Sequence, residues 1–406
     1  MIENSKGRKM QSIFILGASR LQLPAIKKAK EKGLYVYVLD YDPKAPGIQF
    51  ADQYLEISTI DKEAVYNAAN IYKPDYIITS TSDMPVRTVS WVCEKLGKKT
   101  DISYEGSILA TNKIAMRNKM KECGIPIPLF FEAQSLYEFR SIAKEMPDRF
   151  ILKPADNSAS RGVILIDKNV NSNLDELYKY CVQYSRSGEV LLEEYMEGPE
   201  VSVEAYSVDG VPHIITITDK IITEQPFFVE MGHTEPSRLT DEQQMDIRDV
   251  AEKAIRAIGM KDGPTHTEIK VTPTGAKLVE IAARLGGDFI TSYLVPLSTG
   301  VDMIECSFAS LFENKPPYEK KISQGSAIRF IQGKAGILQS VEGLYEASKS
   351  KGVIEVELYA KPGEYIRNLE NSSDRIGHVI AVGKDASEAA ENAERALKRI
   401  SLLINT

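Results

Sequence analysis

The sequence predicts a mixed fold in which a doubly wound parallel sheet is followed by α+β units. Residues 12–100 alternate short apolar strands with amphipathic helical stretches, the pattern of a parallel sheet covered by helices. After about residue 104 strands follow one another across short turns such as Asp209-Gly210, which favours antiparallel hairpins. This change of pattern and a length of 406 residues together predict two or three domains.

Composition and charge exclude several classes of protein. Fifty Lys and Arg against 57 Asp and Glu give a net charge of -7, which argues against a nucleic-acid-binding surface. No apolar run approaches the roughly 18 residues that a membrane span needs, and the polar N-terminus does not resemble a signal peptide. The four cysteines are scattered, as in proteins of a reducing compartment. We therefore expect a cytoplasmic protein that binds neither nucleic acid nor membrane.

The N-terminal region contains the strands SIFILGAS, LYVYVLDYDP and PDYIITSTSD, with an amphipathic helix that ends at Gly33. Its first turn, Gly17-Ala18-Ser19-Arg20, lacks the spaced glycines of G-x-G-x-x-G. Asp40 does end the second strand, where a ribose-binding acid sits in dinucleotide-binding folds. We interpret the region as a supporting α/β domain rather than the NAD site of a dehydrogenase.

The elements after residue 104 follow a different pattern of strands and helices. A helical stretch over 104–124 precedes the strand RFILKP, a loop of small residues and the hairpin strands VSVEAYSV and VPHIITITDK. A helix near 240–258 is followed by THTEIKV and AKLVEIAAR, joined by the turn TPTG. From about residue 310 a third unit mixes strands with a final helix over 385–404. This order predicts a nucleotide-binding α+β module with a smaller α+β unit after it.

Two carboxylates form the strongest chemical pattern. Glu268 and Glu280 lie in neighbouring strands of one short hairpin, which can place both side chains on the same face. Adjacent carboxylates repel each other, so burying them requires a cation, and Mg²⁺ prefers such oxygen ligands. The pair predicts a metal site, with a solvated sheet face as the alternative.

Cationic residues accompany this pair. Arg284 follows the second strand directly and precedes Gly286-Gly287, and glycines let backbone amides approach anionic oxygens. Lys153 ends the strand RFILKP before the small-residue loop 157–162, which suits contact with phosphate. Lys113 is a further candidate, although many helix lysines are simply solvated.

The segment Glu193-Glu194-Tyr195-Met196-Glu197-Gly198-Pro199-Glu200 is an acidic strand end before a turn. Its backbone can contact an adenine edge, and Glu200 can accept hydrogen bonds from ribose hydroxyls. A charged loop is the alternative.

In this order, the residues resemble the ATP-grasp superfamily, in particular its carboxylate–amine ligases such as L-amino-acid ligases, phosphoribosylglycinamide synthetases and biotin-carboxylase-like enzymes. The resemblance implies an N-terminal domain over 11–110, an ATP-grasp domain over 111–310 with a lid at about 125–195, and a C-terminal α+β domain over 311–406. It also implies ATP and Mg²⁺, or Mn²⁺ in its place, as cofactors and a homodimer as the assembly.

The resemblance assigns roles to individual residues. Arg284 and Lys153 would be catalytic, and Glu268 and Glu280 would bridge the metal. The ATP-binding residues would be Lys113, Lys153, Ser158, Ser160, Arg161, Gly162, Glu193, Glu194, Tyr195, Met196 and Glu200.

One departure concerns the metal. Most members of the family carry Asn two residues after the second metal-binding Glu, whereas this chain has Ala282. The implied mechanism is that a substrate carboxylate attacks the γ-phosphorus of ATP and that an amine then attacks the acyl phosphate. The substrates are therefore a small carboxylate and a small amine.

The substrate site is predicted from an acid and a polar loop. Asp288 follows the paired glycines, and Glu230 and His233 lie in the loop FVEMGHTEPS. A carboxylate beside Gly287 can bind the ammonium group of an α-amino acid, although Asp is also a common helix N-cap. A purine-pathway ligase, a bicarbonate-activating enzyme and a non-catalytic ATP-binding protein remain as alternatives.

Overall fold

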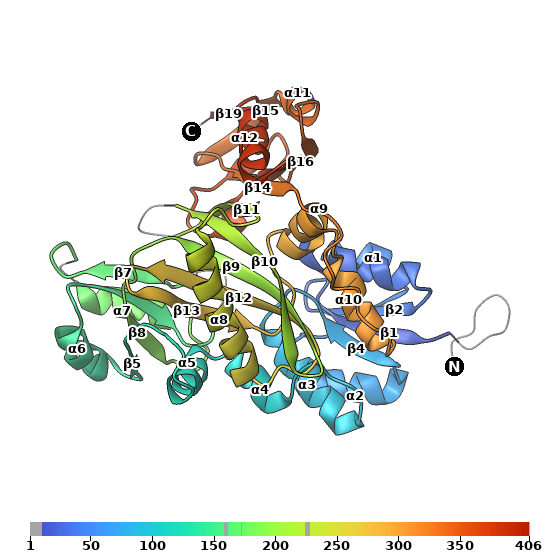
Figure 1. Ribbon diagram of the computed structural model, residues 1–406, viewed down its shortest axis with the longest axis horizontal. Helices are drawn as coiled ribbons and strands as arrows, with labels where there is room; N and C mark the ends of the chain where they lie inside the picture. The colour runs from blue at the N-terminus through green and yellow to red at the C-terminus, as the bar shows by residue number, and fades with distance from the viewer. Residues whose placement is uncertain (1–9, 158–160, 172, 224–227, 406) are drawn as a thin grey trace.

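The computed structural model describes residues 10–157, 161–171, 173–223 and 228–405. They form four sheets (Figure 1). The N-terminal sheet is parallel throughout, with strand order β3-β2-β1-β4. Its elements are β1 Ser12–Leu16, α1 Leu23–Glu31, β2 Tyr35–Asp40, β3 Gln53–Glu56, α2 Lys62–Tyr72, β4 Tyr76–Thr79 and α3 Met84–Leu96. The predicted N-terminal parallel sheet is thus confirmed.

The second sheet is small and antiparallel, with strand order β5-β8-β6-β7. The predicted helix over 104–124 is in fact two helices, because the chain breaks at Asn112, whose side chain caps the second one. The elements are α4 Tyr104–Leu109, α5 Lys113–Glu122, β5 Phe130–Ala133, α6 Leu136–Glu145, β6 Arg149–Pro154, β7 Ile164–Asp167, α7 Leu174–Val182 and β8 Val190–Glu194.

The largest sheet has eight strands in the order β13-β12-β9-β10-β11-β14-β18-β16. The predicted hairpin at Asp209-Gly210 is confirmed, since Val208 pairs with Val211 and both turn residues have positive φ. Three strands after residue 310, β14, β16 and β18, continue this sheet through the pairing of β11 with β14. Its strands are β9 Glu200–Val208, β10 Val211–Ile222, β11 Glu230–Glu235, β12 Gly263–Thr272, β13 Gly275–Ala282, β14 Gly325–Ile331, β16 Val353–Leu358 and β18 Gly377–Gly383.

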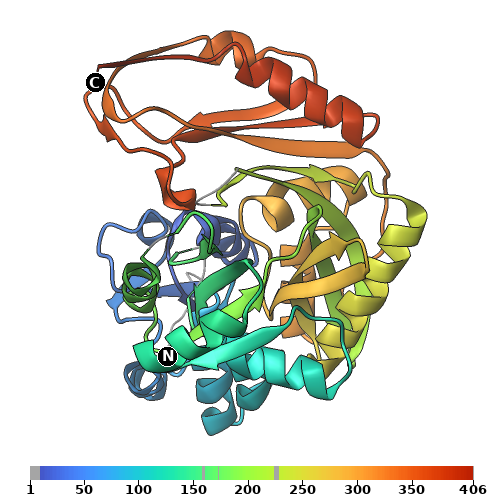
Figure 2. The same cartoon turned by 90° about the vertical axis from the view of Figure 1, so that its left-hand side faces the viewer.

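Helices cover this sheet at both ends. The capping-box helix α8 (Asp241–Ala257) packs on β13, β10 and β12, and α12 (Ala386–Leu397) packs on β18 and β14. Figure 2 shows the C-terminal strands and α12 as a layer above the rest of the chain. The remaining α- and π-helices of the described residues are the π-helix η3 Ile290–Leu294, α9 Val295–Thr299, α10 Met303–Leu311 and α11 Leu344–Ser348, and the short 3-10 helices are η1 Arg20–Gln22, η2 Ile48–Phe50 and η4 Ser372–Asp374.

The prediction of one final helix over 385–404 is wrong at its end. The helix stops at Leu397, and β19 (Ser401–Asn405) pairs with β15 (Gly336–Glu342), which also pairs with β17 (Tyr365–Ile366). The run SLLIN alternates half-buried and exposed residues, which is the pattern of a strand. No helix in the described part of the chain has the length and apolar character to cross a membrane.

Candidate active site

A cavity of about 940 Å³ lies where the N-terminal, small and large sheets meet. Gly162 lies beside the cavity, with a φ of +78°, whereas Ser158 and Ser160 fall outside the described residues. Most of the predicted site residues line it, namely Lys113, Lys153, Arg161, Glu193, Glu194, Tyr195, Met196, Glu200, Glu230, His233, Glu268, Glu280, Arg284, Gly287 and Asp288.

The predicted carboxylate pair is formed by strand register. Glu268 of β12 is directly opposite Glu280 of β13, and both side chains are partly exposed to the cavity. Each carboxylate contacts a different ammonium group: Lys113 Nζ lies 2.8 Å from Glu280, and Lys220 Nζ lies 3.0 Å from Glu268. A lysine in the first turn of α5 opposes the helix dipole, so the contact with Glu280 compensates for an unfavourable position.

Lys220 is buried among three acids. Its Nζ lies 2.7 Å from Glu200, 2.8 Å from Glu230 and 3.0 Å from Glu268, and the side chain is 2% exposed. Burial alone would lower the pKa of Lys220, but the three carboxylates raise it well above its ordinary value. Burial conversely favours the protonated form of Glu268, yet Lys220 and His266 hold the pKa of that carboxyl well below its usual range. Glu268 is therefore ionised and available to a cation.

Lys153 is held by a buried acid. Its Nζ lies 2.6 Å from Glu193, which also accepts a hydrogen bond of 2.7 Å from Arg117 Nε. Burial lowers the pKa of Lys153, with Arg117 and Lys113 acting in the same direction. Burial opposes ionisation of Glu193, but Arg117 and Lys153 outweigh it and lower the pKa to about 2. The side chain of Glu193 thus positions the ammonium group of Lys153, whereas its backbone lies at the edge of the cavity where adenine is predicted to bind.

The rest of the predicted adenine and ribose segment borders the same cavity. Glu194 contacts Lys277 at 3.2 Å, and Tyr195 lies under the guanidinium of Arg149, 4.4 Å from the ring centroid. Gly198 makes the turn into β9, and a Cβ there would lie 1.9 Å from the carbonyl oxygen of Val271. That turn requires glycine, and it sets where Glu200 enters the cavity.

Arg284 is anchored by the N-terminal domain. Its Nε donates to Asp83 at 2.7 Å, and Nη1 donates to the carbonyl of Leu285 at 3.0 Å. Burial lowers the pKa of Arg284, but Asp83 more than compensates and raises it. The loop after Arg284 also packs tightly, because a Cβ on Gly286 would lie 2.7 Å from Glu204. Gly286 thus serves packing, whereas Gly287 faces the cavity.

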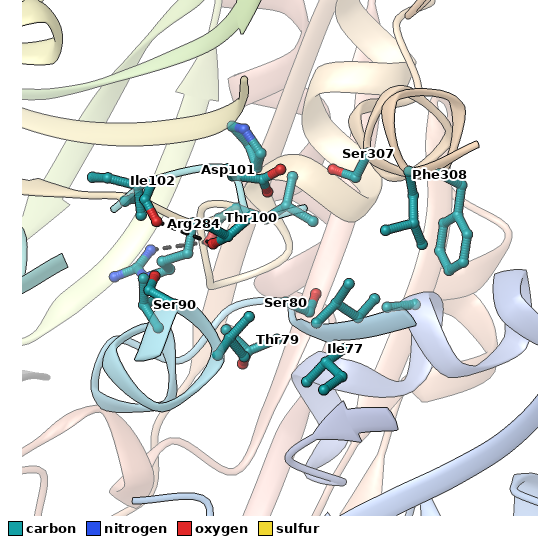
Figure 3. A pocket seen from close by; sticks show the side chains of 18 of the residues that line it. Ile77, Thr79, Ser80, Ser90, Thr100, Asp101, Ile102, Arg284, Ser307 and Phe308 are labelled. Atoms are coloured by element: carbon teal, nitrogen blue, oxygen red, sulfur yellow. Dashed lines mark hydrogen bonds between the residues drawn. The ribbon is translucent and has the colours of Figure 1, made fainter. Parts of the chain in front are cut away.

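Arg284 also borders a second, smaller cavity of about 70 Å³, enclosed by β4, α3 and α10 (Figure 3). Hydroxyl groups of Ser80, Ser90 and Ser307 line it, together with Asp101. Burial raises the pKa of Asp101 to about 7. The volume and these polar groups suit a few ordered water molecules behind the arginine.

The predicted substrate residues lie close together, but one of them is already paired with another residue of the protein. Ligand atoms of Glu230, His233 and Asp288 lie within 4.8 Å of one another. Both oxygens of Asp288 accept hydrogen bonds of 2.6 Å from Arg375, and His233 Nε2 lies 3.4 Å away. Although burial opposes its ionisation, Arg375 and His233 hold the pKa of Asp288 well below its usual range.

This geometry corrects two ideas about Asp288. The helix-cap alternative is wrong, because Phe289 is the N-cap of η3 and makes no side-chain cap bond. The expectation that the carboxylate finds its partner in a ligand rather than in the protein is also wrong, because Arg375 already occupies both oxygens. A substrate would therefore meet an Arg375–Asp288 pair rather than a lone acid.

The donor set fits a divalent cation bound by oxygen. Glu268 and Glu280 are ligands of the type that Mg²⁺ selects, and the cavity beside them has room for phosphate groups, which usually complete such sites. Ala282, in the position where the resemblance predicts Asn, is buried and has no side-chain oxygen to offer. Bound phosphates and water would have to supply the remaining ligands.

Comparison with known proteins agrees with this arrangement. Residues 146–292 match the ATP-grasp domain family, and residues 329–404 match the L-amino acid ligase C-terminal domain 2. This chain contains an ATP-grasp domain and an L-amino acid ligase C-terminal domain, and L-amino acid ligases are among its homologues. The match places Lys153, Glu268 and Glu280 inside the ATP-grasp segment and Arg375 inside the C-terminal one.

Three similar proteins illustrate the relationship. The chain is 29% identical to an uncharacterized protein of Sinorhizobium fredii, over all of this chain and 82% of the other. It is 27% identical to the alanine–anticapsin ligase of Bacillus subtilis over 55% of this chain, and it spans about half (51%) of that ligase. The crystal structure of an L-amino acid ligase from Bacillus licheniformis has a TM-score of 0.82, 20% identity, and coverage of 98% of this chain and 100% of the other.

Four site residues were missed by sequence reasoning: Arg117, Lys220, Asp83 and Arg375. Lys220 has a local signal, since a charged residue inside the apolar strand TITDKII indicates a buried charge with partners. No local pattern in the sequence marks Arg117, Asp83 or Arg375, because their hydrogen-bond partners lie 76, 201 and 87 residues away.

Proposed function

We propose that this protein uses ATP to activate the carboxylate of an amino acid and then joins the acyl group to an amine. The observation that carries the proposal is a shared cavity. The segment that matches the L-amino acid ligase C-terminal domain contributes Arg375, Tyr359 and Phe330 to the cavity that contains Lys153 and the carboxylate pair.

In the first step a carboxylate oxygen of the substrate attacks the γ-phosphorus of ATP. An O–P bond forms, the bond to the bridging oxygen breaks, and ADP leaves with the electron pair. Lys113 and Lys153 line the cavity at what we propose is its phosphate end, where their charges would stabilise the transferring group. Glu268 and Glu280 would hold Mg²⁺, or Mn²⁺, which when bound would supply charge to neutralise the phosphates.

In the second step the nitrogen of an amine attacks the acyl carbon. A C–N bond forms, and phosphate leaves with the C–O electron pair as the nitrogen loses a proton. Arg284 carries a permanent charge at the proposed substrate end of the cavity and would stabilise the tetrahedral oxyanion. Its bond to Asp83 fixes its direction before substrate arrives, which reduces the reorganisation that the step requires.

The amino acid would bind between Gly287 and the cluster of Glu230, His233 and Asp288. Arg375 stacks on Phe330, with the guanidinium carbon 3.7 Å from the ring centroid. Arg375 provides a cation for the carboxylate of an α-amino acid, and Glu230 lies beside it as an acid for the ammonium group. We further propose that the enzyme works in the cytoplasm and is a homodimer.

A substrate panel tests the proposal. Release of ADP and phosphate should require an amino acid together with an amine, and mass spectrometry should detect the amide. Turnover with glycine and phosphoribosylamine would identify a purine-pathway ligase, and turnover with bicarbonate a carboxylase-type enzyme. ATP binding without turnover on any pair would refute catalysis.

A further inference from the structure

The C-terminal strands contain a second cluster of metal-ligating side chains, outside the wall of the large cavity. Glu355 and Glu357 lie on the same face of the edge strand β16, and His378 lies on β18 directly opposite Glu357. The three residues offer ligand atoms that all lie within 4.8 Å of one another. The His378 ring is fully buried under Phe289, whose centroid is 4.5 Å away.

The two nitrogens of His378 have different surroundings. Nδ1 makes a hydrogen bond of 2.6 Å with the hydroxyl of Tyr359. Nε2 has no hydrogen-bond partner among the described residues, and its nearest acid, Glu355, lies 3.7 Å away. A buried nitrogen without a partner costs free energy, whichever tautomer the ring adopts. A cation between Nε2 and the carboxylates removes that cost.

The charges around the cluster favour a cation. Two carboxylates face one guanidinium, that of Arg20, which pairs with Glu357 and lies over the ring of Tyr359. The described groups therefore leave a net negative charge beside the unpartnered imidazole nitrogen.

We propose that Glu355, Glu357 and His378 bind a first-row divalent transition ion, with Zn²⁺ as the representative case. One imidazole and two carboxylates form a ligand set suited to such ions, and a water molecule can complete four-coordination. The hydroxyl of Tyr359 orients the imidazole, as outer-shell partners commonly do for metal-bound histidine. The site would join β16 to β18 and so stiffen the wall that Phe289 and Tyr359 provide to the cavity.

The test separates this site from the Glu268–Glu280 pair. Full-length Glu280→Gln protein, freed of metal with a chelator, is titrated with Zn²⁺ against a chromophoric chelator. It should retain one bound Zn²⁺ per chain and gain about 3 °C or more in Tm at saturation. Adding Glu355→Gln or Glu357→Gln should abolish that binding, whereas adding Glu391→Gln, an exposed acid of α12, should not.

Two further readouts keep the test decisive. Tyr359→Phe in the same background should weaken Zn²⁺ binding by about 10-fold or more, because the imidazole loses its orienting bond. Co²⁺ in place of Zn²⁺ should give a visible absorption band in the Glu280→Gln protein that Glu355→Gln removes. Absence of Zn²⁺ uptake by Glu280→Gln, or uptake unchanged by Glu355→Gln and Glu357→Gln, would overturn the proposal.

Discussion

The two ends of the large cavity are built differently. At the phosphate end, Glu268 and Glu280 come from one hairpin, and their approach follows from strand register. At the substrate end, Arg284 is held by Asp83 and Asp288 by Arg375, contacts that join segments 201 and 87 residues apart. The proposed metal-binding pair thus rests on local structure, whereas the groups proposed to select the substrate depend on the packing of separate units.

The largest expected effect is at the phosphate end. Glu280→Gln keeps the size of the side chain but removes one charge from the pair, so kcat should fall by about 100-fold or more while Tm changes little. ADP release at saturating Mg-ATP measures this, with Glu319→Gln, an exposed acid, as the control. Near-normal ATP consumption by a folded Glu280→Gln protein would refute the metal assignment.

At the substrate end, Asp288→Asn should raise KM for the amino acid by about 10-fold or more and leave KM for ATP within about twofold. The loss follows because Arg375 would be left buried without its anionic partner. Steady-state kinetics with each substrate varied in turn measures the two constants. If both KM values stay unchanged while Tm falls, the Asp288–Arg375 pair only stabilises the fold. The proposal that this end of the cavity selects the substrate would then be wrong.

Stability should depend on pH through Glu235, in the strand that carries His233. Glu235 is fully buried and accepts bonds of 2.8 Å from Thr218 and Ser298, and burial raises its pKa to about 8. Since the folded pKa exceeds the unfolded one, the stabilisation is complete below about pH 4.5 and is lost as pH rises through about 8.

Glu235→Gln imitates the protonated acid and should therefore reduce the fall in unfolding free energy between pH 5 and 8.5 by a few kcal/mol, of the order that this shift implies. Urea denaturation at the two pH values measures the difference. An identical fall in wild type and variant would mean that Glu235 does not titrate in this range.

The smallest expected effect concerns the pair of Lys277 and Glu194 at the adenine edge. Both side chains are partly exposed, and such pairs contribute only about 0–1 kcal/mol. Lys277→Gln should therefore change Tm by less than about 3 °C and KM for ATP by less than about threefold. A much larger rise in KM would show that the adenine edge depends on this cation.

The difference between the two ends of the cavity also explains how much of the site can be predicted from the sequence. The spacing of Glu268 and Glu280 and the position of Lys153 at a strand end were sufficient to predict which residues face one cavity. Lys220 was missed because its one local signal is a charge in an apolar strand, and Arg117 was missed because its helix contains several other cations. The end of the chain was misread as helix because the pairing of β19 with β15 lies outside any local pattern.

The sequence by itself determined the alternation that forms the parallel sheet, the hairpins that align the carboxylates, and the set of charged residues available for catalysis. Only the tertiary structure decided that Asp288 belongs to Arg375, that Asp83 directs Arg284, and that three acids share Lys220. The reason is physical. Register and periodicity act over a few residues, whereas a buried charge is stabilised by whichever partner the packing of distant segments brings within hydrogen-bond distance.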